Sequence, residues 1–336
     1  MINQHLEGDD DQMPCTLPAR VSIGMPVFNG EAFLSQSIQS LLEQTYVDFE
    51  LIISDNASTD RTESICRKYA LQDSRIRYVR NSENVGLESN FQRVFDLSQG
   101  ELFMWASHDD LWEPEFIEEL VDLLKRSPDA ALAFCRFDSI DADAHSVKQY
   151  DLKDLTDPCR YRALGKLLMQ DESEGKPNLI MGLMRRQLLQ EAQGFHLWSG
   201  RSWSADVLVV FRVLSLGRLQ LSDRFLFHKR LQVDNRGDVG KPISTLRERI
   251  ASHSDQFEEW KIYWSTYHRM IGALTGLAGR TQWRLHMTVF WRESMQRVKR
   301  FRAILREYRR ALRDFCFRRK RQRPGAENTM VKQRAA

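Results

Sequence analysis

Short apolar runs alternate with helical patterns along the first third of the chain. Residues 20–28, 49–55, 75–81 and 101–107 each read as a strand, since they are mainly apolar and bounded by turn residues. Between them, residues 31–45 place Phe33, Ile38, Leu41 and Leu42 on one helical face, and residues 57–72 and 90–98 also predict helices. Strands that alternate with helices at this spacing predict an α/β fold, with a mostly parallel central sheet flanked by helices.

A polar, turn-rich segment follows each of the four expected strands. These segments are PVFNGE (26–31), SDNASTD (54–60), NSENVG (81–86) and SHDD (107–110). Open parallel sheets bind ligands outside the carboxyl ends of their strands. We therefore expect the four segments to converge on one binding site.

Asp55 and Asp109 are the candidate ligand-binding carboxylates in these segments. One carboxylate can accept a hydrogen bond from a nucleotide base or ribose, and another can hold a hard divalent cation beside phosphate oxygens. The structural alternatives are an Asx turn or helix cap at Asp55, and the N-cap of the helix expected over residues 113–126 at Asp109 or Asp110. Because the adjacent carboxylates of Asp109 and Asp110 repel each other, a bound cation would relieve the repulsion.

Residues 21–60, followed by NVGLESNFQRVFDLSQGELFMWASHDDLWEPEF (84–116), resemble the family 2 glycosyltransferases of the GT-A fold. The resemblance covers residues 20 to about 140 and continues with less agreement to about 235. It implies that the first-strand loop and the second-strand aspartate hold the nucleotide, and that the segment after the third strand contributes to the same site. The positions concerned are Pro26, Phe28, Asn29, Asp55, Asn84, Gly86 and Asn90.

The family's metal motif usually reads Asp-x-Asp-Asp, whereas this chain has Ser107, His108, Asp109 and Asp110. The resemblance implies that Asp109 binds Mg²⁺ or Mn²⁺. Ser107 and His108 would then contact ribose or diphosphate through neutral hydrogen bonds. A packing role is the structural alternative for His108.

The second half of the sequence is expected to supply the acceptor site and the catalytic base. Residues 176–195 resemble the family's acceptor-facing segment, and Asp206 stands near the start of an apolar helix where the family carries an acidic pair. Ala205 replaces the first member of that pair. We expect Asp206 to take the proton from the acceptor hydroxyl in an inverting transfer; a helix-cap or first-turn charge is the alternative. Asp110, His228 and Arg230 are further candidates for diphosphate or acceptor contacts, with a solvated edge as the alternative for the two basic residues.

The chain changes character after residue 238. Residues 280–323 carry 16 lysines and arginines against three acidic residues, whereas residues 1–279 have a net charge of −11. Two apolar stripes at helical spacing lie in this part of the chain. They are Phe257, Trp260, Trp264, Tyr267, Ile271 and Leu274, then Val298, Phe301, Leu305, Tyr308, Leu312 and Phe315. The stripes are suited to packing on the acidic catalytic domain, to a homodimeric coiled coil or to an anionic membrane surface.

We therefore expect a disordered segment (1–18), a GT-A domain (19–238), a basic amphipathic helical extension (239–322) and a disordered tail (323–336). Five scattered cysteines, an acidic start and no apolar run of about 18 residues favour a cytoplasmic protein, with the inner face of the membrane as a site of peripheral association.

The expected function is inverting, metal-assisted transfer of a sugar from a UDP or dTDP donor to a hydroxyl of a glycan or lipid-linked acceptor in polysaccharide biosynthesis. A nucleic-acid-binding or scaffolding protein is the alternative suggested by the basic helices, although it leaves the strand-end segments unexplained. A sugar-phosphate nucleotidyltransferase would need a Gly-rich basic loop after the first strand. A dinucleotide oxidoreductase would need GxGxxG, which follows none of the expected strands.

Overall fold

The computed structural model describes residues 20–195 and 205–231, and part of residues 264–302, chiefly 282–295. The chain divides into two compact units. The first contains the described residues of 20–163, 171–195 and 205–231, and the second contains residues 164–170 and the described residues from 264 onward. The expectations for residues 1–18 and 323–336, and for Phe257, Trp260, Leu274 and the second stripe beyond Val298, lie outside the described residues.

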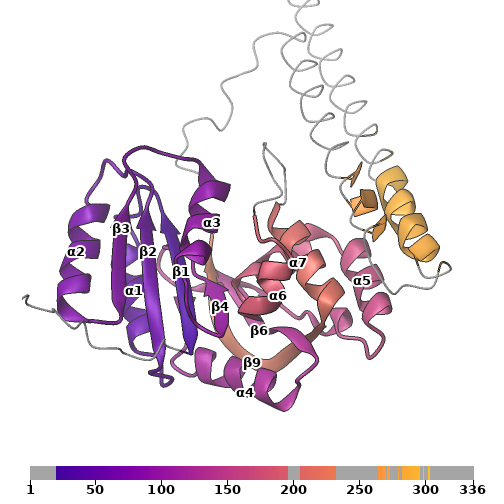
Figure 1. Ribbon diagram of the computed structural model, residues 1–336, viewed down its shortest axis with the longest axis horizontal. Coiled ribbons are helices and arrows are strands. Elements are labelled where there is room, and N and C mark those ends of the chain that lie inside the picture. Colours follow the sequence, from indigo (N-terminus) through magenta and orange to yellow (C-terminus); the bar gives the residue numbers. More distant parts are fainter. Residues whose placement is uncertain are drawn as a thin grey trace, which may run out of the picture. The chain divides into compact units, whose positions relative to one another are not determined.

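The first unit begins with the expected alternation of strands and helices (Figure 1). Four parallel strands lie in the order β3-β2-β1-β4. Their bounds are β1 Val21–Val27, β2 Phe49–Asp55, β3 Ile76–Arg80 and β4 Leu102–Trp105; the helices between them are α1 Leu34–Leu42, α2 Thr62–Gln72 and α3 Leu87–Asp96. The prediction of a helix-flanked α/β sheet is confirmed.

The central strands of this sheet are buried on both faces, which explains why they lack alternating polar positions. All seven residues of β1 are buried. Right-handed crossovers put α1 and α2 on one face and α3 on the other. On the α3 face, a Cβ atom on Gly24 would lie 2.7 Å from the Val94 side chain and 2.8 Å from Phe103. Glycine at this position therefore permits the close approach of α3 to the sheet.

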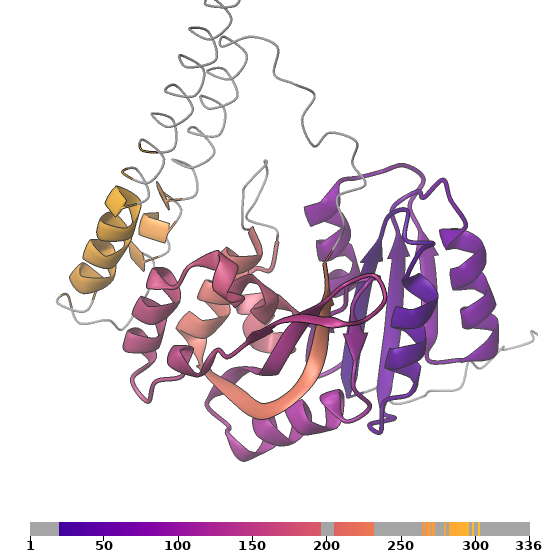
Figure 2. The ribbon, with the colours of Figure 1, turned by 180° about the vertical axis from the view of Figure 1, so that it is seen from behind.

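The sheet continues beyond β4 as β8-β6-β9-β5, with both parallel and antiparallel pairs. The strands are β5 Leu111–Trp112, β6 Ala130–Ile140, β7 Ser146–Tyr150, β8 Leu183–Arg185 and β9 Arg218–Arg230; the helices are α4 Phe116–Arg126, η1 Lys153–Leu155, α5 Arg160–Met169, η2 Glu172–Glu174, η3 Lys176–Met181, α6 Arg186–Glu191 and α7 Ala205–Leu216. The long strand β9 curves strongly and packs against α4 (Figure 2).

The curvature of β9 positions the site. Its C-terminal end pairs with β5, so that His228 lies opposite Leu111, directly after the SHDD segment. Residues 107–110 therefore lie between the edge of the parallel sheet and the last three residues of β9. Segments more than a hundred residues apart in sequence meet at this point.

The second unit buries the described part of the first apolar stripe. Trp264, Tyr267 and Ile271 are each at most 2% exposed. Among the residues that the structure describes, no helix combines the length and the apolar character needed to cross a membrane.

Candidate active site

The loops after β1 and β2 are joined by backbone-to-side-chain hydrogen bonds. The Asn29 amide donates to Ser58 Oγ at 2.9 Å, and Asn29 Oδ1 accepts from the Thr59 amide at 2.9 Å. Asn29 adopts a left-handed conformation with φ of 52°. Phe28 and Asn29 are exposed just beyond the carboxyl end of β1. Pro26 lies buried inside β1, in register with Ser54. Of the three nucleotide-binding candidates in this segment, Phe28 and Asn29 thus face solvent.

Asp55 ends β2 as a fully buried carboxylate with three donors. Its Oδ1 accepts from the Ser58 amide at 2.8 Å, and its Oδ2 accepts from Tyr78 Oη at 2.8 Å and Arg80 Nη1 at 2.7 Å. The bond from Ser58 is the local turn contact that the sequence offered as an alternative. Sequence reasoning missed Tyr78 and Arg80, although their spacing of two residues along β3 places them on one face of the strand.

Asn84 and Asn90 shape the loop after β3. Asn84 Oδ1 accepts from Asn56 Nδ2 at 2.8 Å, which links this loop to the one after β2. Asn90 is 2% exposed; it donates to the Ser54 carbonyl at 2.9 Å and accepts from Ser54 Oγ at 2.7 Å. These contacts tie both residues to the strand-end network around Asp55.

The SHDD segment lies beside the β1 loop. A Cβ atom on Gly30 would lie 2.7 Å from His108 Cδ2, so the imidazole rests directly against the backbone there. Burial lowers the pKa of His108, which favours the neutral form of the imidazole. Ser107 Oγ donates to Asp109 Oδ1, and Asp109 is 2% exposed. His108 lies against Gly30, the neighbouring Asn29 bonds Ser58, and Ser58 bonds Asp55. Residues 107–110 and the loop after β2 therefore belong to one continuous cluster at the carboxyl ends of the parallel strands.

Asp110 is fully buried and has a partner from β9. Lys229 Nζ lies 3.1 and 3.3 Å from its two carboxylate oxygens, and the Arg230 amide donates to Oδ1 at 2.9 Å. Burial raises the pKa of Asp110 to about 6, against the opposing effect of Lys229. Asp110 is not the N-cap of the next helix, because α4 begins at Phe116 with Glu115 as its N-cap. The ammonium group of Lys229 supplies the compensating cation for this carboxylate.

Arg230 and His228 have partners inside the protein. Arg230 is 1% exposed, and it donates to the Asp109 carbonyl at 2.8 Å and to Gln36 Oε1 at 3.0 Å. Its Nη1 donates to the carbonyls of residues 141 and 142 at 2.9 and 2.7 Å. His228 Nδ1 lies 2.6 Å from Asp138 Oδ1, and Nε2 lies 2.9 Å from Glu113 Oε1. The enclosed guanidinium of Arg230 thus fixes the backbone of Asp109, and the imidazole of His228 joins two other acidic segments. The expected contacts of these two residues with diphosphate or acceptor stay predictions.

Asp206 is the second residue of α7 and lies in the first helical turn. Its Oδ1 accepts from the Val207 amide at 2.8 Å. Burial raises the pKa of Asp206 to about 6; Glu172 also raises it, while Lys176 lowers it. A carboxyl group that titrates near neutrality can exchange a proton with a substrate under physiological conditions. The preceding residues 196–204 lie outside the described residues.

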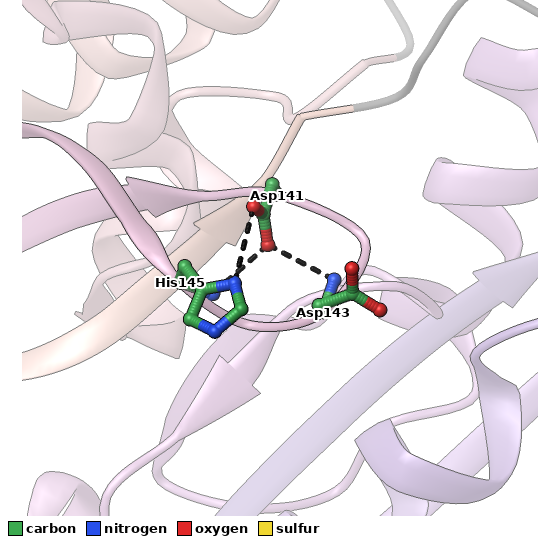
Figure 3. Close-up of side chains that lie close together, drawn as sticks. All are labelled: Asp141, Asp143 and His145. Carbon is green, nitrogen blue, oxygen red and sulfur yellow. Dashed lines mark hydrogen bonds and ion pairs between the residues drawn. The ribbon is translucent and has the colours of Figure 1, made fainter.

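A second group of potential metal ligands lies in the β6–β7 hairpin. Asp141, Asp143 and His145 hold their ligand atoms within 4.8 Å of one another (Figure 3). Asp141 Oδ1 accepts from the amides of Asp143 and His145, both at 2.9 Å. These are the bonds of a tight turn, and Asp143 and His145 are exposed. The backbone of this turn contacts the cluster around Asp109, because the carbonyls of residues 141 and 142 accept hydrogen bonds from Arg230.

A cavity of about 680 Å³ lies elsewhere, at the amino ends of β1 and β4. Arg20, Gly100, Lys125 and Arg185 are among its lining residues. Arg185 donates to the carbonyls of residues 124, 127 and 130, so its charge holds the turn after α4. The cavity is therefore at the amino ends of the parallel strands, whereas the candidate site residues gather at their carboxyl ends. None of the candidate site residues lines the cavity.

Curated proteins resemble part of this chain in sequence, and solved structures resemble it in fold. An uncharacterized glycosyltransferase of Rickettsia typhi is 35% identical over 128 residues, which cover 38% of this chain and 39% of that protein. An uncharacterized glycosyltransferase of Methanocaldococcus jannaschii is 27% identical over 132 residues, which cover 39% of this chain and 46% of the relative. The matched segments thus span less than half of these relatives.

Among solved structures, Staphylococcus aureus TarS 1–349 in complex with UDP-GlcNAc aligns with a TM-score of 0.60 and 14% identity, covering 81% of this chain and 72% of that one. This similarity confirms the predicted GT-A type of fold. The family profile of glycosyl transferase family 2 matches residues 22–191, which is half of the chain and includes the four strand-end segments. The chain belongs to glycosyl transferase family 2.

Proposed function

We propose that this glycosyltransferase moves a sugar, with inversion, from a UDP or dTDP donor to a hydroxyl of a glycan or lipid-linked acceptor. The observation that carries the proposal is the convergence of Asp55, Asp109 and their loops at one carboxyl edge of a parallel sheet. This is where such sheets bind nucleotides. TarS, which shares the fold, has been solved with UDP-GlcNAc and with UDP, and this supports the choice of donor class.

The nucleotide would lie over the loops after β1, β2 and β3. Phe28, exposed by 43%, offers an aromatic face to a base. Asp55 would contribute to nucleotide binding partly by orienting Arg80. The Arg80 side chain bonds the buried carboxylate and is 32% exposed. Asn84 and Asn90 would hold these loops together. Asn84 bonds Asn56, which follows β2, and Asn90 bonds Ser54 near the end of β2.

Asp109 would hold Mg²⁺ or Mn²⁺. The donor set fits a hard cation, because Mg²⁺ is commonly held by one or two carboxylates with substrate phosphates and water completing the shell. When bound, the ion supplies positive charge that stabilises the departing diphosphate. Ser107 donates to Asp109, and Arg230 binds its carbonyl oxygen, so the carboxylate and its backbone are both oriented before a donor arrives.

Asp206 would act as the general base. Its carboxylate would take the proton of the acceptor hydroxyl as that oxygen bonds to the anomeric carbon, while the bond from that carbon to the diphosphate oxygen breaks and the diphosphate leaves with the electron pair. A pKa near 6 leaves the group ionised at neutral pH yet basic enough to accept the proton. From β9, Lys229 would position residues 107–110 by bonding Asp110, and His228 would bond Glu113 just beyond them.

The test uses the full chain with a panel of nucleoside diphosphates and their sugars. We expect a rise in melting temperature with UDP or dTDP that increases with Mn²⁺, because a ligand that binds only the folded state stabilises it. Turnover of the matching sugar donor should require the same metal. Equal shifts with every nucleotide, with and without metal, would contradict the proposal.

A further inference from the structure

The helix over residues 282–295 is drawn in yellow in Figure 1. One side of this helix is buried by the protein. Leu285, Val289 and Arg292 are at most 9% exposed and recur at spacings of four and three. Gln282 Nε2 donates to the Ile271 carbonyl at 3.0 Å, and Arg292 Nη1 donates to the Met169 carbonyl. This side of the helix therefore packs within the second unit.

The same helix has a second apolar face that remains exposed. Trp283 is 63% exposed, Phe290 56% and Trp291 59%. At 100° per residue, these side chains point away from the stripe of Leu285 and Val289. Five of the fifteen exposed large apolar side chains among the described residues fall in this helix: Trp283, Met287, Phe290, Trp291 and Met295. Single exposed apolar residues are ordinary, but a contiguous group on one helix face indicates an interaction surface.

The chemistry of this surface identifies its partner. Trp and Phe beside Met, on a helix that carries basic residues, are typical of helices that lie in the interface of a bilayer. The surrounding segment, residues 280–323, carries 16 basic residues against three acidic ones. Pairing with the same helix of a second copy would bring two such positive segments together, which electrostatic repulsion opposes. The surface of an anionic bilayer would attract the basic residues and also bury the apolar face.

We propose that the exposed face of this helix, formed by Trp283, Met287, Phe290, Trp291 and Met295, binds the headgroup layer of an anionic phospholipid bilayer. The aromatic rings enter the interface, and the basic residues of 280–323 attract the anionic headgroups. The inference is independent of the donor and acceptor proposed above, since it requires no nucleotide sugar.

Co-sedimentation of the full chain with vesicles tests this proposal. Vesicles of equal parts phosphatidylglycerol and phosphatidylcholine should retain the protein, and pure phosphatidylcholine vesicles should not. Trp283→Ser with Trp291→Ser should weaken partitioning by at least about tenfold, because two large apolar surfaces no longer enter the interface. The matched control is Leu71→Ser with Val47→Ser, which removes apolar side chains that are 89% and 70% exposed on the first unit and should leave partitioning unchanged.

Salt and oligomeric state complete the test. At about 1 M salt, where the Debye length is about 3 Å, retention on anionic vesicles should fall severalfold. Unchanged partitioning of the double tryptophan variant would overturn the proposal. So would light scattering that shows a dimer of the unaltered chain and a monomer of that variant, because a second copy would then occupy the face. Melting curves of both variants should match the unaltered chain, which excludes unfolding as the cause of lost binding.

Discussion

Replacing Asp206 with Asn separates a catalytic base from a helix-stabilising charge. Burial raises the pKa of this carboxyl to about 6, whereas an unfolded chain holds it near about 3.9. The folded state therefore binds the proton more tightly than the unfolded state. Stability must fall as the pH rises from about 4 to about 6, and the cost persists above that range. Asn has nearly the same shape and no charge to bury.

The size of the effect follows from the pKa difference. A difference of about two units at about 1.4 kcal/mol per unit sets a ceiling of roughly 3 kcal/mol. Because the side chain is not fully enclosed, we expect Asp206→Asn to raise the free energy of unfolding by on the order of 1–2 kcal/mol at pH 8. At pH 4 the two proteins should differ little, since the native carboxyl group is then protonated in the folded state.

Urea denaturation at pH 4, 6 and 8 measures the stability difference, and steady-state kinetics measures the catalytic cost. Turnover should fall by roughly 10²- to 10⁴-fold with donor affinity unchanged, and the acid limb of the kcat/KM profile near pH 6 should disappear. Asp223→Asn is the control, because Lys153 lowers the pKa of that exposed carboxyl and its loss should slightly destabilise the fold. A loss of stability in Asp206→Asn at pH 8 would show that the charge serves the helix terminus. Donor affinity that falls as far as turnover would refute the base assignment.

Four further substitutions, one of them added to another, test residues 107–110 and their neighbours. Asp109→Asn should abolish the Mn²⁺-dependent part of UDP binding in calorimetry while leaving the melting temperature nearly unchanged; retained metal dependence would remove Asp109 as the metal ligand. Lys229→Met leaves the buried Asp110 carboxylate without its charged partner and should cost roughly 3–5 kcal/mol in urea denaturation at pH 8. Adding Asp110→Asn should recover most of that loss, and no recovery would mean that the pair is not coupled. Gly30→Ala puts a methyl group 2.7 Å from the His108 ring and should cost about 1–3 kcal/mol of stability and weaken UDP binding; wild-type affinity would show that the loop adapts.

The elements of the first half could be predicted from sequence because their signals are local. The apolar runs and helical faces around β1 to β4 depend on spacing within about ten residues, and the parallel arrangement makes the strand-end loops meet. The partners of the carboxylates could not be predicted in this way. Lys229 meets Asp110 across 119 residues, and only the curvature of β9 and its pairing with β5 bring them together. The same pairing delays the start of α4 to Phe116, which is why the N-cap interpretation of Asp110 failed.

The pairing of Asp110 with Lys229 also lowers the negative charge around the proposed metal ligand, Asp109. Asp109, Asp110 and Lys229 together carry a net charge of −1, and Ser107 and neutral His108 add none. An Asp-x-Asp-Asp motif with the same lysine would carry −2. A weaker negative field attracts a free divalent cation less, but it also repels the diphosphate of the donor less. On the proposed assignment of Asp109 as the metal ligand, most of the metal's affinity would come from the diphosphate oxygens, and metal and nucleotide should each tighten the binding of the other by the same factor, as linkage requires.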